Sequence, residues 1–123
     1  MVKILLVDNS SYIRYQLMLL LKRDNYKNFI HAIDYPDAIT KFKEEKPDLT
    51  ILDMVMENKN GIETYKEMIK INPKAKIIIM ITEGEVYKDL IKEAKELCDN
   101  TIKKPLPPSD ISALLNKLVP QEQ

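Results

Sequence analysis

The chain has 123 residues, 45% of them hydrophobic and 31% charged, which fits one globular domain and excludes a disordered or fibrous chain. Nineteen basic residues are matched by nineteen acidic ones, so no net field attracts nucleic acid or an anionic membrane. The apolar run Ile4 to Val7 is too short for a signal peptide or a membrane span, and the single cysteine, Cys98, cannot form an internal disulfide. We therefore expect a cytoplasmic protein with no direct contact to nucleic acid or membrane.

In the first half of the chain, apolar runs alternate with segments of helical spacing. Residues 2–7 form the first predicted strand, and residues 10–23 the first predicted helix, with Ser10 or Asn9 as its cap. A weaker strand is predicted at 28–33, followed by a helix whose first turn contains Pro36. The third strand covers residues 49–52.

The second half repeats this alternation. Gly61 begins a helix that must end before Pro73, because the residue preceding a proline avoids the α region. Residues 77–81 form a continuous apolar strand, a helix is predicted over 86–97 with Val86 on its buried side, and a short strand covers 101–103. The last helix is predicted at 111–118. Five repeats of strand and helix predict an α/β fold, a doubly wound parallel sheet with helices on both faces.

Polar side chains follow four of the five predicted strands. The strand ends are Val7-Asp8-Asn9, Leu52-Asp53, Ile81-Thr82 and Ile102-Lys103-Lys104. In a parallel sheet the carboxyl ends of the strands share one edge, and ligands bind outside that edge. We therefore expect the side chains of Asp8, Asp53, Thr82 and Lys104 to converge on one small anion and one hard cation, with Asp53 open to solvent.

These residue types favour phosphoryl chemistry. The carboxylates of Asp8 and Asp53 repel each other unless a cation lies between them, and oxygen ligands of this kind suit Mg²⁺. Asp53 can attack a phosphoryl group as a nucleophile. Lys104 can pair with Asp53 and then with a phosphoryl oxygen, while the Thr82 hydroxyl can donate to another phosphoryl oxygen. Either acid alone would be interpreted as a cap or turn residue.

Several motifs resemble those of bacterial response-regulator receiver domains, in the same order and spacing and over nearly the whole chain. They are Leu6-Val7-Asp8-Asn9-Ser10 with Arg14 and Leu17, Pro47 to Met56, Gly61, Met80-Ile81-Thr82 and Lys104-Pro105-Leu106. The resemblance implies a flavodoxin-like (βα)5 sheet of order 2-1-3-4-5. It also implies a two-component phosphoprotein that takes a phosphoryl group from a sensor histidine kinase or phosphotransfer protein onto Asp53.

By the same resemblance, Mg²⁺ is held by Asp8, Asp53, the carbonyl of Val55 and the neighbouring Asn9, and the Lys104-Pro105 bond is cis. The domain itself is no enzyme in the usual sense, although it assists its own phosphorylation and dephosphorylation. The signal then passes to an unknown effector protein by surface contact, through the fourth helix, fifth strand and fifth helix.

Some positions depart from the family pattern and are expected to tune the reaction or its switch: Asn9, Glu57, Glu83, Gly84 and Thr101. Asn9 replaces an acid, which predicts weaker metal binding. Glu83 replaces a small residue and would repel an incoming phosphoryl group unless its side chain points to solvent. Thr101 replaces an aromatic residue and cannot make the inward swing of a ring, and Glu57 replaces a proline.

Three alternatives stay open. The chain can be a degenerate receiver that binds partners without phosphorylation, or a fragment of a longer regulator. A small flavin or nucleotide enzyme is disfavoured because the segment Asp8 to Ser11 contains no glycine. We expect a receiver domain at residues 1–119 and a tail at 120–123. Arg14 is expected on the helix surface, His31 is expected to be packed or half-exposed, and Cys98 is expected to be a small buried hydrophobe.

Overall fold

A computed structural model describes residues 1–56 and 59–121 of the chain. Its strands form one five-stranded parallel sheet in the order β2-β1-β3-β4-β5, which confirms the predicted flavodoxin-like topology. No helix in the described ranges is long and apolar enough to cross a membrane. The elements are β1 (Lys3–Val7), α1 (Ser11–Arg23), β2 (Asn28–Ala32), α2 (Tyr35–Glu45), β3 (Leu49–Asp53), α3 (Gly61–Ile71), β4 (Ile77–Ile81), the 3-10 helix η1 (Glu85–Tyr87), α4 (Lys88–Leu97), β5 (Thr101–Lys103) and α5 (Pro108–Leu118).

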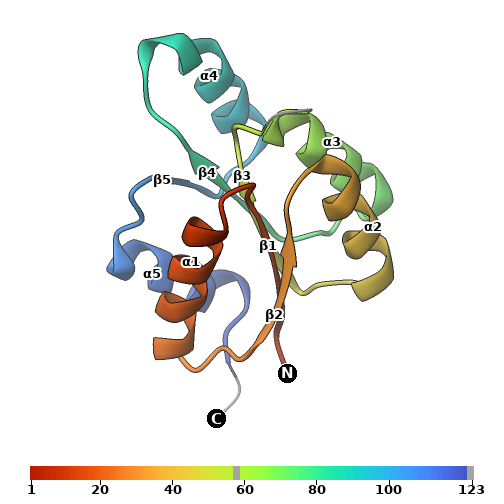
Figure 1. Ribbon diagram of the computed structural model, residues 1–123, viewed down its shortest axis with the longest axis vertical. Coiled ribbons are helices and arrows are strands. Elements are labelled where there is room, and N and C mark those ends of the chain that lie inside the picture. Colours follow the sequence, from red (N-terminus) through yellow and green to blue (C-terminus); the bar gives the residue numbers. More distant parts are fainter. Residues whose placement is uncertain (57–58, 122–123) are drawn as a thin grey trace.

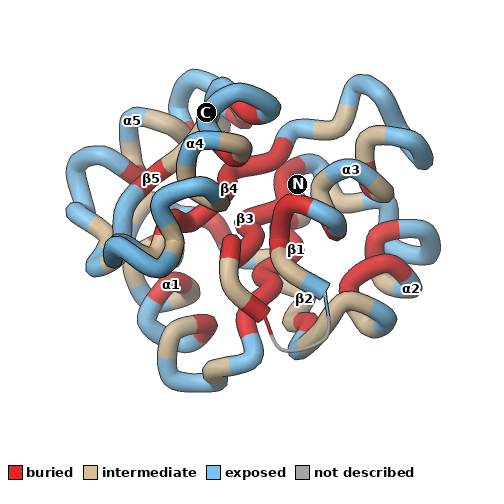
Figure 2. Tube along the Cα trace, turned by 90° about the horizontal axis from the view of Figure 1, so that it is seen from above, coloured by how far each residue is buried: buried red, intermediate tan, exposed pale blue. Residues whose placement is uncertain are grey.

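Helices cover both faces of the sheet. Helices α1 and α5 lie on one face and α2 and α3 on the other, while α4 projects beyond the carboxyl ends of the strands (Figure 1). The core is therefore split into two clusters, one on each side of the sheet. Every residue of β3 and β4 is buried, and Figure 2 shows the strands as the buried centre of the molecule. Central parallel strands have this continuous apolar character because both of their faces are covered.

Capped helix starts bring short loops to the carboxyl edge of the sheet. The side chains of Ser10, Asp34 and Asn60 accept hydrogen bonds from the backbone N–H groups three residues later, at the starts of α1, α2 and α3. Each cap satisfies one of the backbone donors that the first turn of a helix leaves free. These three helices therefore begin directly after the loops that follow β1, β2 and β3.

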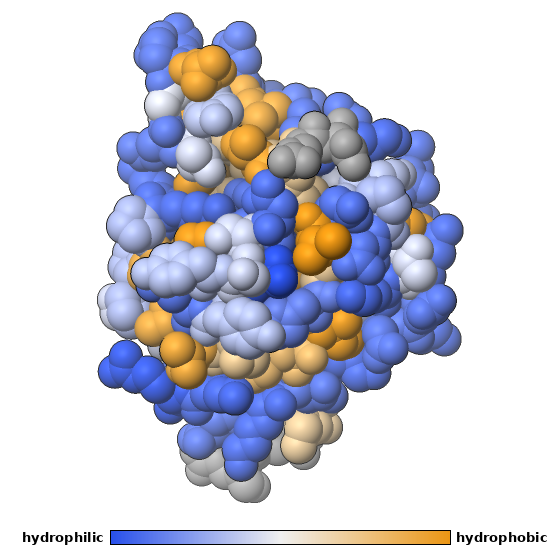
Figure 3. Space-filling model, viewed as in Figure 1, coloured by the Kyte–Doolittle hydropathy of each residue, from blue (hydrophilic) through white to orange (hydrophobic). Residues whose placement is uncertain are grey.

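The segment after β4 differs from the prediction. The predicted helix 86–97 is divided into η1 and α4, and Val86 is 84% exposed, so its expected place on the buried side was wrong. Gly84 has a φ of 147°, a value that side-chain-bearing residues rarely adopt, and it turns the chain outward before η1. Figure 3 shows an apolar patch on the projecting top of the molecule, where η1 and α4 lie in Figure 1.

The last helix also begins earlier than predicted. Helix α5 starts at Pro108 with Pro107 at its cap, so Ser109 and Asp110, which precede the predicted start at residue 111, lie inside the first turn. Proline suits this position because its fixed φ is already helical. At the opposite end of the molecule, the Tyr26 hydroxyl donates to the Val119 carbonyl at 2.9 Å, and the Gln121 side chain donates to the Asp24 carbonyl. The end of α5 is thus tied to the loop between α1 and β2.

Candidate functional site

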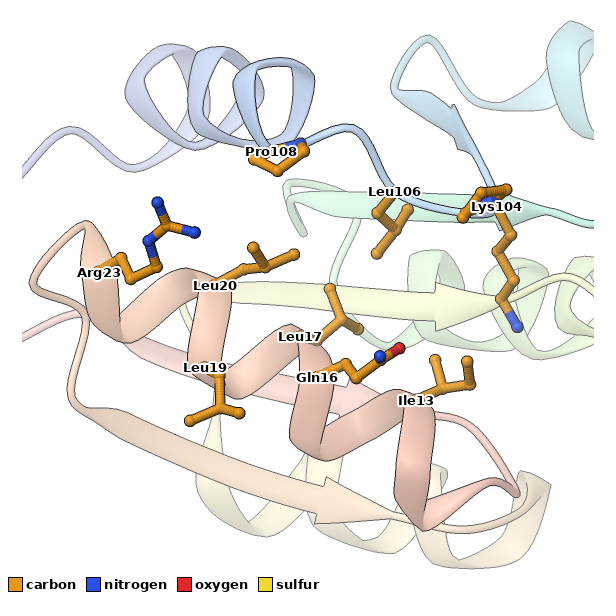
Figure 4. Close-up of a pocket in the computed structure, with 10 residues that line it drawn as sticks. Ile13, Gln16, Leu17, Leu19, Leu20, Arg23, Lys104, Leu106 and Pro108 are labelled. Atoms are coloured by element: carbon orange, nitrogen blue, oxygen red, sulfur yellow. The ribbon is translucent and has the colours of Figure 1, made fainter.

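Three of the predicted site residues meet at the carboxyl edge of the sheet. Asp8 follows β1, Asp53 ends the adjacent strand β3, and Lys104 follows β5. The Lys104 Nζ lies 2.9 Å from Asp8 Oδ2 and 3.1 Å from Asp53 Oδ1. The Lys104 backbone N–H donates to the Ile81 carbonyl at 3.0 Å, and the side chain extends past the strand end (Figure 4). The Lys104-Pro105 bond that follows is cis.

The Asp53 carboxylate is covered more closely than expected. The side chain of Asp53 is only 5% exposed and that of Asp8 only 2%, whereas the Lys104 side chain is 21% exposed. The expectation that Asp53 is open to solvent was therefore wrong for this structure. The physical reason is the ion pair itself, because the Lys104 ammonium lies against both acids and shields them from water.

Burial and charge set the protonation of this cluster. Burial, opposed by Lys104 and reinforced by Asp8, raises the pKa of Asp53 from 3.8 to about 6. The pKa of Lys104 is raised because its hydrogen bond to Asp8 and the charges of both acids outweigh the lowering effect of burial. The site thus holds an excess of negative charge around one cation.

All polar atoms of Asp8 have partners. Its N–H donates to the Ala32 carbonyl at 3.1 Å, and its Oδ1 accepts from the Ser10 N–H at 2.9 Å. Its backbone carbonyl accepts from Arg14 Nη1 at 2.5 Å. Arg14 is only 8% exposed, so the expectation of a surface charge was wrong. The signal was present in the sequence, since positions 14, 17 and 21 share one helix face and Leu17 and Leu21 are core residues.

The remaining predicted positions lie on or next to strands β1, β3, β4 and β5. Thr82 directly follows β4 and is partly exposed, Asn9 is exposed, and Thr101 begins β5 and is partly buried. The Val55 N–H donates to Asp53 Oδ1 at 3.4 Å, so the Val55 backbone lies beside the Asp53 carboxylate. Glu57 lies outside the described residues.

Glu83 forms an exposed ion pair outside the cluster of Asp8, Asp53 and Lys104. Its carboxylate pairs with Lys103 Nζ at 2.8 Å, and both side chains are more than half exposed. This hydrogen bond, together with the Lys103 charge, holds the pKa of Glu83 below its ordinary value. Of the two adjacent lysines, Lys104 therefore pairs with Asp8 and Asp53, whereas Lys103 pairs with Glu83.

Comparisons with known proteins agree with this geometry. The family model of the response regulator receiver domain matches residues 4–116. The chain belongs to this family. It is 34% identical to the chemotaxis protein CheY of Thermotoga maritima over 116 residues, with 94% of this chain and 96% of the relative covered. It is 36% identical to the sporulation initiation phosphotransferase F of Bacillus subtilis over 121 residues, with 96% and 94% covered.

A solved structure shows the same fold. The receiver domain protein from Clostridium thermocellum superposes with a TM-score of 0.85 at 27% identity, covering 97% of this chain and 94% of that one. The chain is thus a receiver domain of the CheY type, consistent with a phosphoacceptor in two-component signalling.

The donor set of this receiver domain fits the Mg²⁺ that is typical of its family. Among the described residues, no group of three or more His, Cys, Asp or Glu side chains could hold a metal ion. Mg²⁺ does not need such a cage, because it keeps several waters and takes one or two carboxylates plus a phosphate. The buried pair Asp8 and Asp53 supplies two carboxylates with a single ammonium, that of Lys104, beside them.

An apolar groove opens beside the acceptor cluster. It has a volume of about 410 Å³ and lies between α1 and the segment from Lys104 to Pro108. Ile13, Leu17 and Leu20 of α1 face Leu106 across it (Figure 4). The outer face of α1 is also apolar, with Tyr12, Leu19 and Tyr15 all more than half exposed. The groove is therefore lined mainly by apolar side chains, with Arg23 and Lys104 as its charged residues.

Proposed function

We propose that Asp53 is the phosphoacceptor and that a phosphohistidine of a sensor histidine kinase or a phosphotransfer protein is the donor. The observation that carries this proposal is the contact of one ammonium, Lys104 Nζ, with Asp53 at 3.1 Å and Asp8 at 2.9 Å on the carboxyl edge of the sheet. Aspartyl phosphate chemistry needs a carboxylate nucleophile together with groups that neutralise charge on the phosphoryl oxygens.

The transfer involves one bond exchange. An oxygen of the ionised Asp53 attacks phosphorus, the new O–P bond forms as the P–N bond to the donor imidazole breaks, and the imidazole leaves with the electron pair and takes up a proton. Lys104 favours the ionised form of Asp53 beforehand and then turns to a phosphoryl oxygen. The Thr82 hydroxyl donates to a second phosphoryl oxygen.

Asp8, Asp53, the carbonyl of Val55 and the Asn9 amide oxygen would hold Mg²⁺. When bound, Mg²⁺ neutralises the charge that gathers on the phosphoryl oxygens. Reaching Asp53 requires the Lys104 ammonium to move, because the carboxylate beneath it is 5% exposed. The same site, with water as the attacking group, would support removal of the phosphoryl group.

We propose further that residues 1–119 form the receiver domain, with 120–123 as a tail, and that the protein signals by contact with an effector protein. The equal numbers of acidic and basic residues support the absence of direct nucleic-acid or membrane contact. The single cysteine agrees with the reducing compartment that a cytoplasmic location would provide. Some relatives are longer, since the chain spans 48% of the transcriptional regulatory protein PhoP of Bacillus subtilis.

The test is incubation with a small phosphodonor such as phosphoramidate and Mg²⁺, followed by intact-mass measurement. Wild type should gain the mass of one phosphoryl group, and Asp53→Asn should gain none. Asp37→Asn, which changes an acid that pairs with Lys41 on α2, should behave as wild type. Equal masses for treated and untreated wild type would contradict the proposal and favour a receiver that binds partners without phosphorylation.

A further inference from the structure

Arg14 connects the metal-binding loop to strand β2. Its Nη1 donates to the Asp8 backbone carbonyl at 2.5 Å, and its Nε donates to His31 Nδ1 at 3.2 Å. The His31 ring also lies against Tyr15, with ring centroids 5.1 Å apart and an angle of 31° between the planes. A single side chain of α1 is therefore fixed at two points, one in the loop after β1 and one on the neighbouring strand β2.

We propose that Arg14, oriented by His31, is a positioning residue that sets the Mg²⁺ affinity of the site by fixing the peptide between Asp8 and Asn9. This inference rests on the proposed function, because it concerns the same metal site. It adds a side chain that touches neither the metal nor the phosphoryl group.

The backbone geometry explains the effect. Asp8 is the point where β1 leaves the sheet, so the direction of its carbonyl sets the direction in which Asn9 and Ser10 continue. The Ser10 N–H must reach Asp8 Oδ1, which it does at 2.9 Å, for the carboxylate to keep its orientation. With the Asp8 carbonyl held by Arg14, this turn and the carboxylate are fixed together.

Arginine suits this role better than lysine. The guanidinium is a planar fork whose Nε and Nη1 donate in fixed directions, so one side chain can bond both the Asp8 carbonyl and the His31 ring. An ammonium at the end of a flexible stem has no such fixed orientation. Substitution by lysine therefore keeps the charge but loses the geometry.

The charge of Arg14 acts in the opposite direction. A buried cation near two acids repels Mg²⁺, so removal of the charge alone would tighten binding. Variants that keep the charge separate the two effects, and Arg14→Lys is one of them. His31→Leu is the other, because burial, Arg14 and Lys41 hold the pKa of His31 below its ordinary value and the ring is neutral at mildly alkaline pH.

The experiment measures Mg²⁺ binding to the unphosphorylated protein by titration calorimetry at mildly alkaline pH, with thermal unfolding recorded for each variant. We expect about tenfold weaker binding for Arg14→Lys, in line with the effect of groups that orient metal ligands. His31→Leu should weaken binding less, and the double variant should bind no more weakly than Arg14→Lys. The control Leu21→Val removes a methylene group from a buried residue at the far end of α1, so it should lower stability without changing Mg²⁺ affinity.

The outcomes separate this inference from the proposed function. Mg²⁺ affinities of Arg14→Lys and His31→Leu equal to that of wild type would overturn the positioning role, as would an equal loss in Leu21→Val. If Arg14→Lys does not fold, His31→Leu decides. A wild type that binds Mg²⁺ and gains a phosphoryl group, with unchanged variants, removes only this inference. A wild type that does neither removes the proposed function as well.

Discussion

At the scale of single residues, the ionised Asp53 carboxylate is destabilised by its surroundings. Its carboxylate is nearly buried beside a second buried acid, and one ammonium serves both. Such an arrangement costs stability in the folded protein, because a buried charge is favourable only when it is fully paired. This unfavourable placement has a function in the proposed reaction, since a bound cation would balance the excess negative charge of the two acids.

Because the buried charge of Asp53 is unfavourable, we predict that Asp53→Asn raises the stability of the protein in Mg²⁺-free buffer, by an amount that depends on pH. A pKa raised from 3.8 to about 6 means that the folded state binds the proton more tightly than the unfolded state does. The stability contributed by the protonated acid is therefore fully present below pH 3.8 and is lost as the pH rises through about 6. A change of this size corresponds to about 3 kcal/mol at neutral pH. Urea unfolding should show a higher midpoint for Asp53→Asn at neutral pH and a shrinking difference toward pH 4.

The control is Asp37→Asn, which should not gain stability, because its carboxylate is partly exposed and paired with Lys41 at 3.2 Å. A midpoint for Asp53→Asn at or below that of wild type at neutral pH would contradict the argument.

The pair of Glu83 and Lys103 yields a second prediction. If Lys103 keeps the Glu83 carboxylate away from the acceptor, Lys103→Met should slow phosphorylation by acetyl phosphate, and Glu83→Gln should not. The slowing should be modest, about threefold, because an exposed ion pair is weak and screened by salt. The measurement is the rate of phosphorylation at low and high ionic strength.

The double variant distinguishes two explanations. If Lys103 acts through Glu83, Lys103→Met should have no effect once Glu83→Gln is present. If Lys103 acts only by attracting the anionic donor, Lys103→Met should slow phosphorylation equally with and without Glu83→Gln. That result would contradict the view that Lys103 holds the Glu83 carboxylate away from Asp53.

At the scale of elements, β3 and the start of α3 hold the acceptor in place. The Gly61 N–H donates to the Met54 carbonyl at 2.7 Å, and a Cβ on Gly61 would lie 2.0 Å from the Asp53 carbonyl oxygen. Only glycine allows this approach of helix to strand end. The first turn of α3 therefore packs directly against the backbone that carries Asp53.

Strand β3 also contains a buried hydroxyl group that has no hydrogen-bond partner among the described residues. Thr50 is 1% exposed, and its Oγ1 is the only buried side-chain N or O atom without a partner among the described residues. Thr50→Val should raise the free energy of unfolding by about 1 kcal/mol, because a buried hydroxyl without a hydrogen bond is destabilising. Guanidinium unfolding would measure this.

Thr64→Val on α3 is the matched control. Thr64 is fully buried, and its hydroxyl donates to the Asn60 carbonyl at 3.1 Å, so this variant should lose stability. A loss in both variants would show that the Thr50 hydroxyl has a partner after all.

At the scale of the whole molecule, topology followed from the sequence, whereas the fine structure of the acceptor edge did not. Alternation of apolar runs and helical spacing is a local property, and it predicted a parallel sheet whose carboxyl edge carries Asp8, Asp53 and Lys104. The strand order came from the family resemblance and is confirmed. Helical spacing with Leu17 and Leu21 does indicate the buried face of α1 for Arg14, but its hydrogen-bond partners, the Asp8 carbonyl and His31, are encoded by no periodicity. Likewise, an apolar side chain at helical spacing predicted burial of Val86, but the backbone turn at Gly84 carried it outward.

The tie between the end of α5 and the loop after α1 has a practical consequence. Both termini emerge at the end of the molecule opposite the carboxyl edge of the sheet (Figure 1), and the Tyr26 and Gln121 bonds anchor the last described residues there. A tag fused behind the chain and captured on a biosensor chip would present the acceptor edge to the flowing analyte. Kinase and effector candidates could then be screened on immobilised protein without obstruction by the support.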